Sequence, residues 1–198
     1  MVKIKEAGLK FDLWQNKLVA SGSFYKTTET NVLQTFEDVD GSITGETGKS
    51  YSVPSGKGTT KGWDVDLAYT ITRGLDLIAS YGRMDARLST GLRTVGQPDA
   101  TAAFMARYEV PKGLFKNFSL AWNYTWWGDS KLDNRTDWTI PAGYVHNAIL
   151  GYKWKNVAVR LRIGNVFDEI KFRPSTQETA VGVTDRRDYR SLSLDYRW

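Results

Sequence analysis

The residues that could support catalysis in this sequence are few, and their surroundings do not suit the chemistry. The run from Gly45 to Ser50 ends in Gly-Lys-Ser, as a phosphate-binding loop does. Such a loop needs a glycine where Ile43 stands and a helix where Pro54 follows, so a surface loop explains the run better. His146 is the only histidine, which leaves no basis for a Ser-His-Asp triad or a His-rich metal site. We predict no catalytic residue and no cofactor.

Two groups of carboxylates could suggest a charged site. Asp64 and Asp66 share one face of an alternating segment, where charges facing a wet interior are the simplest account. Asp129, Asp133 and Asp137 lie in one polar segment and could hold a cation through their oxygens. A solvated loop explains these three residues better, so we predict no metal site.

Cationic and aromatic side chains gather in the polar segments that separate the regular ones. They could attract an anionic ligand through charge and stack on it through their rings. The alternative is a solvated loop surface that contacts lipopolysaccharide phosphates. The predicted ligand-binding residues are Arg87, Arg93, Lys171, Phe172, Arg173, Arg186 and Arg187.

The composition excludes several classes of protein. Aromatic residues make up 13% of the 198 residues, which argues against disorder. The net charge is only +5, and the Lys and Arg residues are interleaved with Asp and Glu instead of forming one basic tract. Nucleic acid is therefore not predicted as a partner. Without cysteine there is no disulfide framework. The sequence has no apolar run of about eighteen residues that could form a transmembrane helix. Its first residues also lack the apolar core of a signal peptide.

Alternation of apolar and polar residues predicts an all-β fold. The period of two places one kind of side chain on each face of a strand. It is clear in the last segment, where Leu192, Leu194, Tyr196 and Trp198 alternate with polar residues. We predict nine strands of about 9–12 residues, the length of a transmembrane β-strand. Alternation marks these strands over residues 3–14, 18–28, 62–70, 75–81, 104–109, 118–126, 148–154, 157–164 and 189–198.

The predicted connections are alternately short and long. Short turns are expected at 15–17, 72–74, 111–117 and 155–156, and long loops at 29–61, 88–99, 128–143 and 165–188. Short periplasmic turns and long external loops are typical of an antiparallel up-and-down β-barrel of the outer membrane. Tryptophans near strand ends would form its aromatic girdle; these are Trp14, Trp63, Trp126 and Trp154. The alternatives are a small barrel acting as a passive pore or adhesin, and a soluble β-sandwich binding module.

The closing segments resemble TonB-dependent outer-membrane receptors of the siderophore type. Residues 159–168 end in Asn-Val-Phe-Asp, similar to the Asn-Leu-Phe-Asp tetrad of the family's penultimate strand, with Val166 where leucine is common. Residues 187–198 resemble the final strand, with Trp198 where phenylalanine is common. Residues 7–10, 61–67 and 140–144 also resemble family positions.

The resemblance implies a function in transport. Such receptors are barrels of about 22 strands with a plugged lumen, and they import a ferric siderophore or similar chelate through the TonB complex, which contacts the plug domain. We expect residues 1–198 to be the C-terminal portion of such a barrel in the bacterial outer membrane, with the plug domain and the N-terminal strands absent. The resemblance also implies that Leu192, Leu194, Tyr196 and Trp198 face lipid and are read by the outer-membrane assembly machinery.

Overall fold

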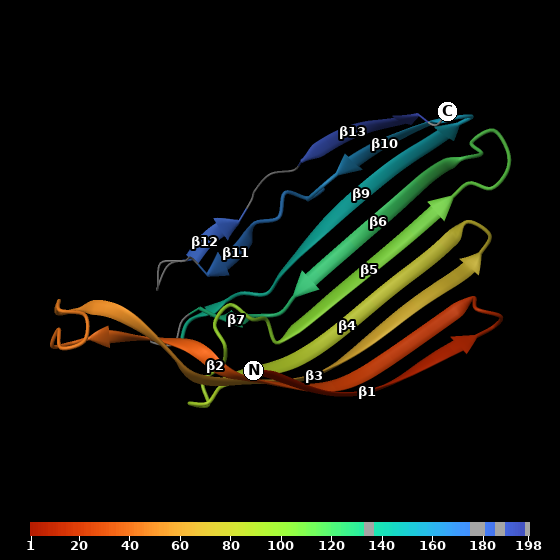
Figure 1. The fold of residues 1–198 in the computed structure, drawn as a ribbon. Coiled ribbons are helices and arrows are strands. Elements are labelled where there is room, and N and C mark those ends of the chain that lie inside the picture. The colour runs from red at the N-terminus through yellow and green to blue at the C-terminus, as the bar shows by residue number, and fades with distance from the viewer. Residues whose placement is uncertain (133–136, 175–180, 185–188, 197–198) are drawn as a thin grey trace.

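The chain forms one curved antiparallel sheet of nine strands (Figure 1). The computed structural model describes residues 1–132, 137–174, 181–184 and 189–196. The strand order β1-β2-β3-β4-β5-β6-β9-β10-β13 follows the chain, which confirms the predicted all-β, up-and-down arrangement. The strands are β1 (Val2–Leu13), β2 (Leu18–Asp38), β3 (Lys49–Thr72), β4 (Leu75–Leu88), β5 (Ala100–Glu109), β6 (Phe118–Trp127), β9 (Gly143–Trp154), β10 (Val157–Ile163) and β13 (Arg190–Tyr196).

Helices are not part of the described structure. None of the described residues forms a helix with the length and apolarity needed to cross a bilayer.

The register of the strands puts the apolar side chains on one face, which we call the outer face. Residues directly opposite each other on neighbouring strands lie on the same side of a sheet. Phe11 is opposite Ala20, which is opposite Leu67, and this row continues through β4 to Phe104 on β5 and Tyr124 on β6. The alternate residues form the polar inner face. The predicted division into an apolar and a polar face is therefore confirmed.

The nine strands form a single open layer, and this layer does not enclose a compact core. The few buried apolar residues of the described chain are Ala100, Leu132, Ile140, Val145 and Ala148. Many large apolar side chains of the outer face are exposed, as expected for a surface that faces lipid. A β-sandwich needs a second sheet of similar size packed on the first. The other sheets in the described residues have only two strands each, so the sandwich alternative is wrong.

The predicted long loop at 29–61 is wrong, because β2 and β3 continue through most of it as a hairpin. Their pairing runs past Thr28↔Thr59 to Asp38↔Lys49, with register shifts after Thr30 and after Val32. Pro54 falls within the second irregularity, where a proline costs the ladder no hydrogen bond. Above a membrane both faces of a hairpin meet water, so its strands need no apolar alternation.

Two other predicted loops contain short paired strands. Residues 128–143 include β7 (Ser130–Lys131) and β8 (Thr139–Ile140), which pair with each other. Residues 165–188 include β11 (Lys171–Pro174) and β12 (Val181–Thr184), a second two-stranded ribbon. These strands are too short to show a period in the sequence.

The short turns and the long connections lie at opposite ends of the sheet (Figure 1). The turn after β1 places Trp14, Gln15 and Asn16 at positive φ, between 54° and 64°. We call the end with long connections the external end, following the usual arrangement of outer-membrane barrels.

Candidate functional site

Polar side chains of the inner face form a connected network near the external end. The Asn123 Oδ1 atom accepts hydrogen bonds from the Thr125 hydroxyl at 3.3 Å and from the Asn147 amide at 3.3 Å. Asn147 in turn accepts a bond from the backbone N–H of Asn165 at 3.0 Å. The network joins β6, β9 and the turn after β10. Such a surface can line a water-filled path.

The carboxylates predicted to face a wet interior do lie on the inner face. Asp64 accepts a hydrogen bond from the Ser23 hydroxyl at 3.0 Å, across β2 and β3. Further along this face an ion pair joins Arg160 and Asp195 at 3.0 Å. These paired groups give the inner face mixed charge.

The Asn-Val-Phe-Asp tetrad forms the turn that ends β10. Asn165 has a φ of 49° and is 2% exposed. Its side chain accepts a hydrogen bond from the Glu169 N–H and donates one to the Glu169 carbonyl, each at 3.0 Å. A short amide side chain tolerates this left-handed backbone and can bridge the turn. The tetrad is therefore a structural device of the external end.

His146 lies in a cluster of rings on the outer face. Its Nδ1 atom accepts a hydrogen bond from the Trp122 indole at 3.2 Å. The rings of Tyr124 and Phe167 lie 4.8 and 5.0 Å from the imidazole, centroid to centroid. These contacts give the only histidine a structural role on the outer face.

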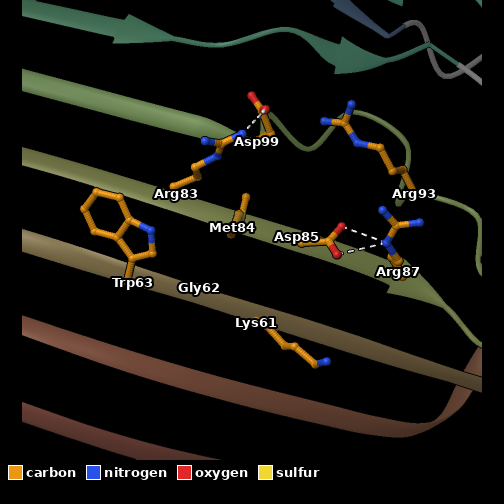
Figure 2. Close-up of a pocket in the computed structure, with 9 residues that line it drawn as sticks. All are labelled: Lys61, Gly62, Trp63, Arg83, Met84, Asp85, Arg87, Arg93 and Asp99. Carbon is orange, nitrogen blue, oxygen red and sulfur yellow. Dashed lines mark hydrogen bonds and ion pairs between the residues drawn. The ribbon is translucent and has the colours of Figure 1, made fainter.

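Arg87 and Arg93, two of the predicted ligand-binding residues, are brought together (Figure 2). Their backbones form an isolated antiparallel bridge at the end of β4. The Arg87 guanidinium holds both oxygens of Asp85 at 2.9 Å, and Arg93 approaches Asp129 at 3.6 Å. Together with Arg83 they line a hollow of about 520 Å³.

The arginine hollow opens on the outer face. Arg83 and Arg87 lie two and six residues after Tyr81 along β4. Because these are even separations, both arginines are on the same side of the sheet as Tyr81. The ring of Tyr81 packs against Trp63 at 5.3 Å, and Trp63 also lines the hollow. Arg87 therefore lies above lipid-facing aromatics and does not face the lumen.

Three of the remaining predicted ligand residues belong to a different part of the external end, on β11. Lys171 and Phe172 lie on β11, opposite Thr184 and Val183 of β12. This ribbon contacts β8 and β9, and in the strand order β5 and β6 separate β9 from β4. The backbone of Arg173 pairs with β12, whereas Arg186 and Arg187 lie outside the described residues.

The tip of the β2–β3 hairpin is a tightly bonded turn that the sequence did not reveal. Asp38 is buried, and its Oδ2 atom accepts bonds from the Thr44 N–H at 2.6 Å, the Thr44 hydroxyl at 2.9 Å and the Ile43 N–H at 2.9 Å. The bond from the Thr44 N–H is the main reason that the pKa of Asp38 lies below its ordinary value of 3.8. Lys49, which completed the Gly-Lys-Ser run, pairs with Glu46 at 3.2 Å.

Metal ligands do not gather anywhere in the described part of the chain: no three His, Asp or Glu side chains come together. Of the three aspartates considered above, Asp129 pairs with Arg93, and Asp133 lies outside the described residues.

The predicted assembly signal lies on the edge strand β13. Leu192, Leu194 and Tyr196 are 73%, 70% and 62% exposed on the outer face, in register with Leu161, Val159 and Val157 of β10. Trp198 lies outside the described residues. Its role and that of its neighbours in assembly stay predictions.

Comparison with known proteins gives a match over most of the chain. Residues 2–166 match the family described as "TonB dependent receptor-like, beta-barrel". The metal-pseudopaline receptor CntO of Pseudomonas aeruginosa is 24% identical over 200 residues, covering 96% of this chain and 27% of that protein. The ferrichrome outer membrane transporter/phage receptor of Escherichia coli is 24% identical over 173 residues, covering 82% of this chain and 22% of that protein. The chain spans about a quarter of the length of these curated relatives.

Solved structures share the fold. The pyoverdine outer membrane receptor FpvA of Pseudomonas aeruginosa superposes with a TM-score of 0.77 at 17% identity, covering 100% of this chain and 30% of that one. The FrpB iron transporter of Neisseria meningitidis gives a TM-score of 0.72 at 18% identity, covering 98% and 31%.

Proposed function

The chain belongs to the TonB-dependent receptor β-barrel family, and we propose that it is the C-terminal portion of a receptor that imports a ferric siderophore or similar metal chelate. Proteins of this family are β-barrels of the bacterial outer membrane, so the predicted localisation is confirmed. They are transport receptors rather than enzymes.

The ligand class is proposed from two kinds of support. The relatives are named for a metal-pseudopaline chelate and for ferrichrome, both of which are metal-binding small molecules. The inner face of this chain is polar and carries charges of both signs, as the wall of a path for a hydrated chelate requires. This polar inner face behind an apolar outer face is the observation that carries the proposal.

The proposed partners follow from the family. The energy for uptake comes through the TonB complex, which contacts the plug domain of such receptors. The outer-membrane assembly machinery inserts the barrel, and lipid covers its outer face. Lys171, Phe172, Arg173, Arg186 and Arg187 remain the proposed ligand contacts. Arg87 and Arg93 face outward and are weaker candidates for this role.

Uptake of iron-loaded chelates tests the proposal. Cells that depend on the complete receptor are offered a panel of radiolabelled ferric siderophores, with and without a functional TonB. We expect uptake of at least one chelate, and we expect it to stop when TonB is deleted or the proton-motive force is dissipated.

Two results would contradict the proposal. Uptake that persists without TonB would indicate a passive pore. Unchanged uptake of every chelate after deletion of the receptor gene, with loss of attachment to surfaces instead, would indicate an adhesin. A variant that replaces Lys171 and Phe172 with Ser then tests the ligand contacts, with the periplasmic-side Lys153→Ser as control.

A further inference from the structure

Three lysines stand side by side on the outer face, in a row that we call the lysine row. Lys5 of β1 is directly opposite Lys26 of β2, which is directly opposite Lys61 of β3. All three side chains are exposed, and none makes an ion pair within the part of the chain that the structure describes. Like charges directly opposite each other destabilise a sheet. The row therefore favours a bound anion that would offset the repulsion.

The carboxylate that continues the lysine row already has a partner. Asp85 is the residue opposite Lys61 on β4, but the Arg87 guanidinium already occupies both of its oxygens. Arg83, which is directly opposite Trp63, meets Asp99 only at 4.0 Å. The outer face here carries more positive than negative charge, and the hollow in Figure 2 adds Arg93 to it.

The lysine row lies next to the aromatic residues that mark the edge of the apolar surface. Phe24 and Trp63 are opposite each other on β2 and β3, and Lys26 and Lys61 follow them by two residues toward the external end. Aromatic girdles of outer-membrane barrels lie at the level where lipid headgroups meet the acyl chains. The cations are therefore at the height of lipid headgroups.

An apolar groove continues from Trp63 into the lipid-facing region. It has a volume of about 570 Å³, and its floor includes two small residues of β2, Ala20 and Gly22. Leu9, Phe11 and Phe24 form its walls, and Trp63 lines both this groove and the arginine hollow. One molecule with a charged head and an apolar chain could occupy both spaces.

We propose that this surface binds a phosphate-bearing lipid of the outer leaflet. The phosphate lies against the lysine row and Arg83, and an acyl chain lies in the groove over Gly22. Guanidinium and ammonium groups bind phosphate through short, charge-assisted hydrogen bonds. Lipid is the favoured source of the phosphate because the apolar groove adjoins the cations at headgroup level.

Lipid binding to the complete receptor tests this site. The receptor is purified in detergent, and its affinity for bisphosphorylated lipid A is measured by native mass spectrometry, with inorganic phosphate and dephosphorylated lipid A as further probes. We expect tight binding of lipid A, and weak binding of either of the other probes. Inorganic phosphate binding as tightly as lipid A, or dephosphorylated lipid A matching it, would overturn the proposal.

Matched variants locate the site. Replacing Lys5, Lys26 and Lys61 together with Gln should weaken lipid A binding about tenfold or more, whereas replacing them with Arg should preserve it. Lys10→Gln is the control, because Lys10 lies on the inner face of β1. An unchanged affinity in the triple Gln variant would refute the headgroup site.

The groove has its own variant. A Cβ at Gly22 would find its nearest neighbour at 3.5 Å, an ordinary contact, so Gly22→Val should fold and fill the groove. We expect it to weaken lipid A binding several-fold while leaving the circular dichroism spectrum unchanged. Full affinity in Gly22→Val would remove the groove from the site.

Discussion

The phenol ring of Tyr25 lies directly over Gly62, its partner in the register of β2 and β3. A Cβ added to Gly62 would stand 2.5 Å from the Tyr25 hydroxyl oxygen and 2.7 Å from the Arg83 carbonyl oxygen. Trp127 covers Gly143 in the same way, and Tyr189 covers Gly164. An aromatic ring over a strand glycine replaces the packing that the glycine lacks and fixes the register.

Gly62→Ala should therefore destabilise the barrel. The new methyl group meets backbone as well as the ring, so the strands must shift, at a cost of about 1–3 kcal/mol. Unfolding of the complete receptor in urea, after refolding into detergent, measures the change. The control is Gly22→Ala, whose added Cβ has space; equal destabilisation by both variants would show that the contact with Tyr25 does not matter.

Adjacent residues of β5 provide a test of the two faces. Phe104 lies on the outer face opposite Tyr124, and Met105 on the inner face opposite Asn123. Phe104→Arg should cost about 2–4 kcal/mol, the range for a cation near the bilayer midplane on the lipid side. Met105→Arg should cost much less, because water reaches the inner face. Unfolding in lipid vesicles compares the variants, and similar losses for the two would contradict the assignment of the faces.

The final strand should matter more for assembly than for stability. Tyr196 is in register with Val157, which is in register with Trp154, and both aromatic residues end their strands on the side of the short turns. A charge near the interface costs only about 0–1 kcal/mol. We expect Tyr196→Asp to lower the amount of receptor in the outer membrane sharply, and Trp154→Asp to lower it little. Immunoblots of membrane fractions measure both; equal amounts would mean that β13 carries no signal.

Asn165→Ala should loosen the external end of β10. The substitution removes the side-chain bonds to Glu169 and leaves a residue that disfavours positive φ, at a cost of about 1–3 kcal/mol. Asn165→Gly relieves the backbone strain without restoring the bonds. The stability of this variant should therefore lie between that of the unchanged receptor and that of Asn165→Ala. Thermal unfolding of the complete receptor ranks the three proteins, and a Gly variant no more stable than the Ala variant would contradict a contribution from backbone strain.

The hairpin tip should open in acid. The pKa of Asp38 is lowered in the folded tip, so its contribution to stability is complete above its ordinary value of 3.8 and is lost as the pH falls through the folded pKa. Hydrogen exchange of the amides of Ile43 and Thr44, corrected for the intrinsic pH effect, should show protection near neutral pH that begins to fall only when the pH drops below 3.8. In Asp38→Asn the pH dependence should vanish; if it persists, another group controls the tip.

The period of two in the sequence was sufficient to predict the sheet. Where lipid lies on one side and water on the other, each residue must match the face on which it lies. The resulting alternation, as at Leu192 and Leu194 of the last strand, was enough to count the nine strands. That requirement ends above the membrane, so the extension of β2 to Asp38 left no periodic signal. Turn geometry was visible only where residues favour it, as at Asn16.

The candidate sites depended on register, which a single sequence does not contain. Arg87 and Arg93 could be selected as external cations, but the sequence does not contain the bridge that pairs them or the alignment of β3 with β4 that puts Arg87 on the outer face. The three residues of the lysine row come from the consecutive strands β1, β2 and β3 but are far apart in the sequence. Only their positions relative to Phe24 and Trp63, two residues away on the same strands, could have indicated it.

Among the residues that the structure describes, the two outermost strands of the sheet, β1 and β13, each pair with a neighbouring strand on one side only. On such an edge roughly half of the backbone N–H and C=O groups point away from the sheet. In hydrocarbon each of these groups costs several kcal/mol when unsatisfied, which far exceeds the net stability of an ordinary domain. These strands therefore cannot enter lipid one hairpin at a time and wait for their neighbours. The edge groups of β1 and β13 must therefore find partners while the strands insert. Whatever covers these two edges sets the order of folding.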